Sequence, residues 1–253
     1  QLPRALGVAF AIGRARRLGV ATHWPHDALA VCSFGDASAN HSTAQGAINA
    51  ACYVSHSGLP IPLLLVCEDN GLGISVPTPA GWIEASFGNR PGLRYEQIDG
   101  ADPLAVFNTT AALAHDVRTT GKPAFLHLRT VRFLGHAGTD VESSYRPAAA
   151  IRQDMARDPI LGTARAVVAE GLATPDELVE RYLSLRTSVR LLALEMIHES
   201  TFESADDVVR ALSARHPDKV AAIASYPGKA TSREKAFGGA LPEHEGPLTL
   251  AET

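Results

Sequence analysis

The chain has 253 residues, of which 45% are hydrophobic and 20% are charged, and its formal net charge is −4. This profile is typical of an ordinary globular protein with one large domain and an appendage. The basic residues are scattered, so we expect no nucleic-acid partner. The longest strongly apolar run, residues 59–67, is too short to cross a bilayer, so we expect no membrane span.

Three cysteines, Cys32, Cys52 and Cys67, lie on apolar segments, and no secretory signal opens the chain. The odd number indicates buried free thiols in a reducing compartment rather than a disulfide framework. We therefore expect a cytoplasmic location. Because Gln1 already lies inside an expected helix, we also expect the natural protein to start earlier.

Helical and strand-like patterns alternate through the first half of the chain. Apolar residues recur at helical spacing in some segments, and short apolar runs bounded by glycine or proline predict buried strands between them. The expected elements are a helix over 2–18, a strand over 28–34, a helix over 44–56 capped by Ser42 or Thr43, strands over 61–66 and 93–98, a helix from Pro103 to Thr119 or Thr120, and a strand over 124–131.

This alternation predicts an α/β domain with a doubly wound, mostly parallel sheet, whose site lies at the carboxyl ends of the strands. After Pro147 the pattern becomes helical, with a capping box at residues 174–177 opening a helix that reaches about His198 and a shorter helix over 205–215. We predict three parts: an α/β domain over 1–147, a helical extension over 148–225, and an extended arm or linker over 226–253.

Polar residues follow two of the expected strands at the point where each one ends. Gly35-Asp36 follows the first strand, and Asp69-Asn70 follows the next. In a parallel sheet these ends can lie side by side, and a carboxylate with a carboxamide oxygen suits Mg²⁺ that also binds a diphosphate. The helix that begins near Ser42 would add free N–H groups. Gly-Asp and Asn-Gly are also common turn pairs, so either pair alone would favour an ordinary turn.

Three ordered motifs resemble a known family. GDASANHSTAQGAIN and LPIPLLLVCEDNGLGIS are similar to the thiamine-diphosphate signature, and TVRFLGHAGTDVESSYRP is similar to a loop of the α subunits of 2-oxoacid dehydrogenases. The resemblance covers roughly residues 1–147. It implies the thiamine-diphosphate-binding fold, with thiamine diphosphate and Mg²⁺ as cofactors.

The resemblance also implies roles for individual residues. Asp36, the Asn70 side chain and the backbone carbonyl of Leu72 match the metal ligands. The backbone amides of Ala37 and Ser38, and the Asn40 side chain, match groups that hold the diphosphate. His136 matches a loop histidine that contacts the diphosphate region and assists acyl transfer, a task suited to imidazole. Arg132 matches a second position that contacts the cofactor. Arg132 and Asp140 also match positions that order this loop, and Tyr145-Arg146 match the residues that anchor its far end.

Three positions depart from the family pattern. Ala37 stands where the family usually has glycine, and a positive φ there would cost roughly 1 kcal/mol. Asp69 replaces the first of two asparagines. Ala137 replaces a serine that is phosphorylated in some relatives, so that form of regulation is excluded.

The activity implied is oxidative decarboxylation of a 2-oxo acid with transfer of the acyl group to a lipoyl arm. A β subunit or β domain would supply the missing half of the active site, so we expect the isolated chain to be inactive. A lipoyl-bearing acyltransferase would be a further partner, and the assembly would be a hetero-tetramer or a dimer of fused chains. The residues do not indicate which 2-oxo acid is used.

Three alternatives stay open. The chain could be an acetoin dehydrogenase, a transketolase-like enzyme, or a non-catalytic scaffold that has lost cofactor binding. The tail GPLTLAET ends where some relatives continue into the β half, so a trimmed piece of a fused α–β chain is a further hypothesis.

Overall fold

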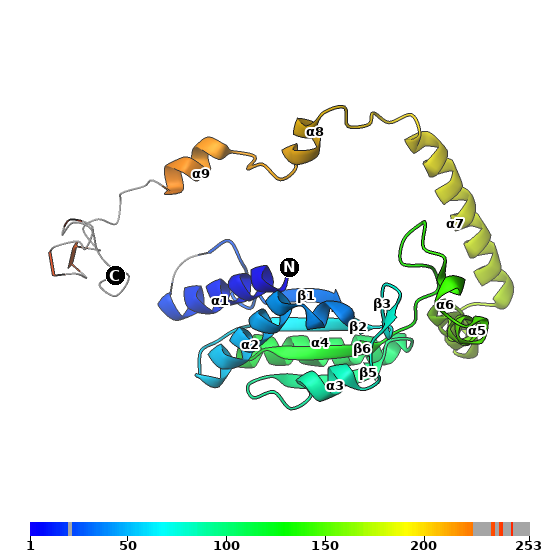
Figure 1. Cartoon of the computed structure of the whole chain (residues 1–253), viewed down its shortest axis with the longest axis horizontal. Helices are drawn as coiled ribbons and strands as arrows, with labels where there is room; N and C mark the ends of the chain where they lie inside the picture. The colour runs from blue at the N-terminus through cyan, green and yellow to red at the C-terminus, as the bar shows by residue number, and fades with distance from the viewer. Residues whose placement is uncertain (20–21, 225–233, 236–237, 240–243, 245–253) are drawn as a thin grey trace. The chain divides into compact units, whose positions relative to one another are not determined.

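The structure is a computed structural model, and it describes residues 1–19, 22–224, 234–235, 238–239 and 244 (Figure 1). The chain divides into two compact units, Gln1–Tyr182 and Leu183–Thr253, which are described separately. Among the described residues, no helix has both the length and the apolar character needed to span a membrane.

A four-stranded parallel sheet forms the centre of the first unit, with the strand order β1-β2-β6-β5. Its strands are β1 (Ala30–Gly35), β2 (Leu63–Asp69), β5 (Arg94–Asp99) and β6 (Ala124–Arg129). Gly35 pairs with Glu68, and Asp69 pairs with Arg129, so the carboxyl ends of β1, β2 and β6 lie at one edge. The prediction of a mixed α/β domain with a parallel sheet is confirmed.

Helices pack on both faces of this sheet because successive side chains of a strand point to opposite faces. They are α1 (Leu2–Leu18), α2 (Ser42–His56), α3 (Trp82–Phe87) and α4 (Pro103–Thr120). One core cluster joins Leu65 and Phe125 to residues of α1, α2 and α3. A second cluster joins Leu64 and Leu126 to Leu113 and Val117 of α4. The alternation along β2 and β6 therefore makes two cores.

The helix ends follow local chemistry. The Asp102 side chain caps α4 by accepting the N–H groups of Leu104 and Ala105, each at 3.0 Å. Gly121, with φ +68°, ends α4 in a conformation that glycine adopts easily.

Several element boundaries differ from those expected. The cap of α2 is His41, whose side chain accepts the Thr43 N–H, so the prediction of Ser42 or Thr43 as the cap is wrong because the helix begins earlier. The expected long loop to Pro91 contains β3 (Leu72–Gly73), β4 (Val76–Pro77) and α3. The strand expected over 124–131 ends at Arg129, and the helix expected over 205–215 ends at Arg210.

Only helices and turns follow β6 among the residues that the structure describes. The helices are α5 (Ala148–Ala156), α6 (Pro159–Ala169), α7 (Pro175–Met196), α8 (Ala205–Arg210) and α9 (Pro217–Ala224), and short 3-10 turns are η1 (Ala37–Asn40) and η2 (Glu142–Ser144). Thr174 and Glu177 form the expected reciprocal capping bonds at the start of α7. The predicted divisions at 147 and 225 stay predictions. Most of the expected arm over 226–253, and all of GPLTLAET, lies outside the described residues.

Candidate cofactor site

A cavity of about 1010 Å³ lies at the carboxyl ends of β1 and β2. The residues predicted to bind the cofactor or the metal all line it. They are Asp36, Ala37, Ser38, Asn40, Asn70, Leu72, Arg132 and His136. The structure thus brings together groups from three separate motifs, while their individual roles stay predictions.

Asp36 is the buried charge of this cavity, with 1% of its surface exposed. It follows the last residue of β1 and precedes η1, and its Oδ2 accepts a hydrogen bond from the Thr78 hydroxyl. Burial raises the pKa of the Asp36 carboxyl above its ordinary value, and the nearby Asp69 carboxylate raises it further. A buried carboxylate is costly unless a cation or hydrogen bonds compensate it, so this position favours a cation.

Asn70 begins the turn that follows β2. Its Oδ1 accepts the N–H of Leu72 at 3.0 Å, and Gly71 has a φ of +75°, which glycine adopts without strain. The turn brings Leu72 to the cavity beside Asn70.

Asp69 does not line this cavity, and its side chain contacts His127 on the neighbouring strand β6. Its Oδ1 accepts the Gly71 N–H at 2.9 Å, and its Oδ2 lies 2.8 Å from Nε2 of His127. The hydrogen bond with His127 lowers the pKa of Asp69 below its ordinary value. Asp36 is therefore the carboxylate that the strand tips offer to the cavity.

The chemistry of these groups fits magnesium and a diphosphate. One carboxylate, one carboxamide and one backbone carbonyl are hard oxygen donors, and Mg²⁺ commonly completes its octahedron with phosphate oxygens and water. The described residues contain no group of three or more His, Cys, Asp or Glu side chains that could hold a metal.

The backbone at Ala37 is unstrained. Ala37 lies in η1, and Ile74, with φ +60°, is the only non-glycine residue with a positive φ in the described part of the chain. The strain considered for a positive φ at Ala37 therefore does not arise. The Ala37 methyl group instead fits against Gly73, because a Cβ placed on Gly73 would lie 2.7 Å from it.

The loop that carries His136 is held by a chain of hydrogen bonds. The backbone N–H of His136 donates to Oδ2 of Asp140 at 2.6 Å, and the Tyr145 hydroxyl donates to the same oxygen at 2.7 Å. Arg132 donates to the Tyr145 hydroxyl at 2.6 Å and to the carbonyl of Ile74 at 2.7 Å.

One nitrogen of the Arg132 guanidinium makes no hydrogen bond to the described residues. Its Nε is buried without a hydrogen-bond partner among the described residues, and the side chain lines the cavity. The guanidinium also forms an ion pair with Glu142, whose Oε1 lies 3.5 Å from Nη2 of Arg132, so part of its charge is already compensated.

Sequence reasoning missed Thr78 and Trp82, which contact Asp36 and Asn40. Both follow the second motif in the glycine- and proline-rich segment that was expected to be a loop. No local pattern links them to residues 42 positions earlier. His41 also lines the cavity, and its place inside the first motif was the signal that could have found it.

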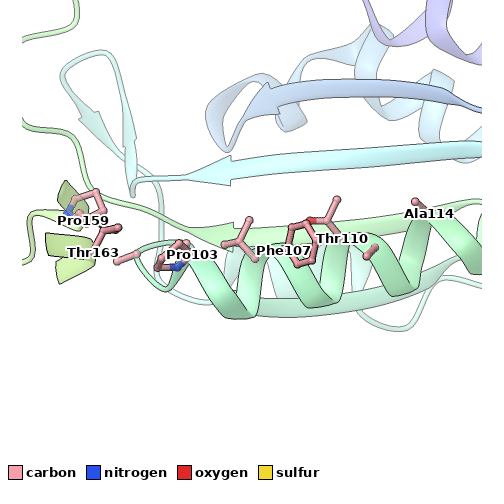
Figure 2. A pocket seen from close by; sticks show the side chains of 10 residues that line it. Pro103, Phe107, Thr110, Ala114, Pro159 and Thr163 are labelled. Carbon is pink, nitrogen blue, oxygen red and sulfur yellow. Dashed lines mark hydrogen bonds between the residues drawn. The ribbon is translucent and has the colours of Figure 1, made fainter. Parts of the chain in front are cut away.

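A second cavity, of about 580 Å³, lies along the first half of α4 and the start of α6 (Figure 2). Pro103, Phe107, Thr110 and Ala114 lie in a row along α4, and Pro159 and Thr163 of α6 lie beside the Pro103 end of this row. None of its lining residues is titratable, so it offers no group for acid–base chemistry.

The fold and the site define an α/β protein with a cavity at the tips of parallel strands. The family model for the dehydrogenase E1 component matches residues 2–191, and the chain therefore belongs to this family. It is 33% identical over 149 residues to the mitochondrial 2-oxoisovalerate dehydrogenase subunit alpha of Caenorhabditis elegans. This match covers 58% of this chain and 31% of that protein. It is 29% identical over 186 residues to the mitochondrial pyruvate dehydrogenase E1 component subunit alpha type I of Ascaris suum. This match covers 71% of this chain and 42% of that protein.

The chain thus spans less than half the length of these relatives. Among solved structures, transketolase from Leishmania mexicana is 15% identical to this chain. The match covers 51% of this chain and 19% of the transketolase chain, and its TM-score of 0.39 is too low to support a conclusion.

The expectation of a cytoplasmic location is wrong, because these relatives are named as mitochondrial proteins. The three cysteines are buried and free, as expected. Free thiols indicate only that a compartment is not oxidising, and they do not distinguish one reducing compartment from another.

Proposed function

We propose that this chain is the α part of a 2-oxoacid dehydrogenase and that its cavity binds thiamine diphosphate with Mg²⁺. The convergence of eight predicted ligand residues on one cavity supports this proposal most directly. Membership of the dehydrogenase E1 component family supports it independently. We further propose that the sheet is a doubly wound thiamine-diphosphate-binding fold and that the helices after Pro147 are its C-terminal extension.

Each group has a distinct task in this proposal. Asp36, the Asn70 side chain and the Leu72 carbonyl would hold Mg²⁺. The backbone amides of Ala37 and Ser38 and the Asn40 amide would donate to the diphosphate, and Arg132 would add a positive charge. The cofactor, when bound, would supply the carbon centre that accepts the electrons left by decarboxylation.

His136 would act at the mouth of the cavity. Its backbone is held by Asp140, and its exposed imidazole can donate or accept a proton near the reacting groups. This suits transfer of the acyl group to a lipoyl arm that approaches from solvent.

The proposal includes partners that complete the reaction. A β subunit or β domain would close the other side of the cavity, and a lipoyl-bearing acyltransferase would accept the acyl group. The 2-oxo acid is of the pyruvate or branched-chain type, because the relatives are named as pyruvate and 2-oxoisovalerate dehydrogenase subunits.

Calorimetry tests the binding claim. The native assembly is titrated with thiamine diphosphate in the presence of Mg²⁺, and the Asp36→Ala variant is compared with Asp27→Ala, which removes a mostly exposed carboxylate elsewhere. Binding that is retained by Asp27→Ala and lost in Asp36→Ala supports the proposal. No binding by the unmodified protein would support a non-catalytic scaffold instead. Release of CO₂ from pyruvate and from branched-chain 2-oxo acids then identifies the substrate.

A further inference from the structure

Two side chains of one later segment contact the first motif from outside the cavity. The Thr78 hydroxyl donates to Oδ2 of Asp36, and the Trp82 indole N–H donates to Oδ1 of Asn40 at 2.6 Å. Asp36 and Asn40 bound the short segment that includes η1, so the two contacts hold its two ends. Thr78 and Trp82 are not among the described residues that line the cavity.

We propose that Thr78 and Trp82 are positioning residues, which orient Asp36 toward the cation and Asn40 toward the diphosphate. This inference rests on the proposed function and extends it to residues that touch neither ligand.

The chemistry of the indole determines how Asn40 is oriented. An indole N–H can only donate, so the Asn40 atom that faces Trp82 is the carboxamide oxygen. The NH₂ group of the same amide, which carries two donors, then remains for the cavity that Asn40 lines. The oxygens of a diphosphate need hydrogen-bond donors. If the Asn40 amide were turned the other way, its carbonyl oxygen would face the diphosphate oxygens and could not donate to them.

Thr78 has the corresponding effect on Asp36. Its hydroxyl donates to Oδ2, which restrains the orientation of the buried carboxylate at the edge of the cavity. A metal ligand held in this way loses little conformational freedom when the ion binds.

The donors themselves are held in place. The Thr78 N–H donates to the Gly71 carbonyl at 2.9 Å, which ties Thr78 to the turn after β2. Trp82 is the first residue of α3, which is anchored in the core by Ile83 and Phe87, exposed by 1% and 0%. Phe87 stacks on Phe125 of β6 with ring centroids 4.8 Å apart. The positions of both donors are therefore determined by the sheet.

The test of Trp82 separates its N–H group from its packing. Trp82→Phe keeps an aromatic ring and removes the donor, and Trp24→Phe is the matched control, because both tryptophans are 43% exposed. In calorimetry of the native assembly with saturating Mg²⁺, we expect Trp82→Phe to weaken thiamine diphosphate binding about tenfold, as loss of a hydrogen bond to a binding group does. Trp24→Phe should bind as the unmodified protein does.

A double-mutant cycle shows whether the effect passes through Asn40. In an Asn40→Ala background, Trp82→Phe should cause no further loss of affinity. An equal loss in both backgrounds would overturn the role of Trp82, because it would mean that the indole acts by another route.

For Thr78, the measured quantity is the Mg²⁺ affinity at saturating thiamine diphosphate. Thr78→Val keeps the shape and removes the hydroxyl, so we expect affinity to fall about tenfold, and Thr78→Ser, which keeps the hydroxyl, should restore most of it. Unchanged Mg²⁺ affinity in Thr78→Val would overturn the role of Thr78, as would a Thr78→Ser variant as weak as Thr78→Val.

The controls separate this inference from the proposed function. If the unmodified protein does not bind thiamine diphosphate, the proposed function fails. If it binds and both Trp82→Phe and Thr78→Val bind equally well, only the inference fails. The intrinsic fluorescence of Trp82 provides a readout without turnover, since binding at Asn40 changes the environment of its hydrogen-bonded indole and should leave the emission of Trp24 unchanged.

Discussion

Oδ2 of Asp69 lies 2.8 Å from Nε2 of His127, across the neighbouring strands β2 and β6. Nδ1 of the same histidine lies 2.6 Å from the Tyr95 hydroxyl on β5, so a row of polar groups crosses three strands. Because Asp69 is committed to this row, it leaves the cavity to Asp36 and Asn70. The row also holds the turn that carries Asn70, since Asp69 accepts the Gly71 N–H.

Removing the histidine should destabilise the chain. In His127→Phe the Asp69 carboxylate, whose side chain is 21% exposed, loses its main partner, and we expect the free energy of unfolding to fall by about 2 kcal/mol. Urea unfolding measures this change. His115→Phe, on the exposed side of α4, is the control and should change the free energy little. Equal stability of the two variants would contradict a structural role for the row.

Phe125 should be among the most sensitive positions of the core. It is fully buried, and its ring contacts the rings of Phe34, Phe87 and Tyr95. We expect Phe125→Ala to lower the free energy of unfolding by about 3–5 kcal/mol, because it leaves a cavity between the sheet and its helices. Phe107→Ala is the matched control, since Phe107 is 70% exposed. A loss as large in Phe107→Ala would mean that the face of α4 shown in Figure 2 is buried in the native assembly.

The order of the His136 loop should depend on acid pH through Asp140. The His136 backbone N–H and the Tyr145 hydroxyl lower the pKa of Asp140 below its ordinary value of 3.8. The pKa of Asp140 is lower in the folded chain than in the unfolded chain. The carboxylate therefore stabilises the loop fully at pH values above the unfolded-state pKa, and this stabilisation is lost as the pH falls through the folded-state pKa. Amide exchange of His136 should therefore stay protected at neutral pH and lose protection only in acid.

The amide of Gly121 serves as the control for this measurement, because it donates to the Val117 carbonyl and depends on no carboxylate. Loss of His136 protection at neutral pH, while Gly121 stays protected, would contradict the proposed loop geometry. Asp140→Asn should show weakened protection of His136 at every pH.

The three thiols should be unreactive in the native protein. Cys32, Cys52 and Cys67 are buried and free, and burial raises the pKa of each above its ordinary value. Thiolates are the reactive species, so iodoacetamide should label none of the three in the native chain and all of them in denaturant. Mass spectrometry counts the labels, and rapid labelling of Cys67 in the native chain would be inconsistent with its position in the core.

The strands β1, β2 and β6 could be predicted because each is a short, mostly apolar run that ends at glycine or at polar residues. This placed Asp36 and Asn70 at strand ends, and parallel pairing brought those ends to one cavity. The helix starts at Asp102 and Thr174 were equally readable, because capping chemistry is local.

Contacts between distant segments could not be read in the same way. His127 lies in an apolar run, and its partner Tyr95 is known only once the strand order β1-β2-β6-β5 is known. Likewise, Thr78 and Trp82 reach Asp36 and Asn40 through the path of a segment whose sequence indicated only a loop. Such contacts depend on tertiary packing, which local propensity does not specify.

The position of the bound cation would show whether Asp36 and Asn70 hold the metal. A crystal structure of the native assembly with thiamine diphosphate and Mn²⁺ in place of Mg²⁺ would show the ion by its anomalous signal. We expect one strong peak in contact with Asp36, the Asn70 side chain and the Leu72 carbonyl. A peak at Asp69 and His127, or a diphosphate bound with no ion at Asp36, would contradict it.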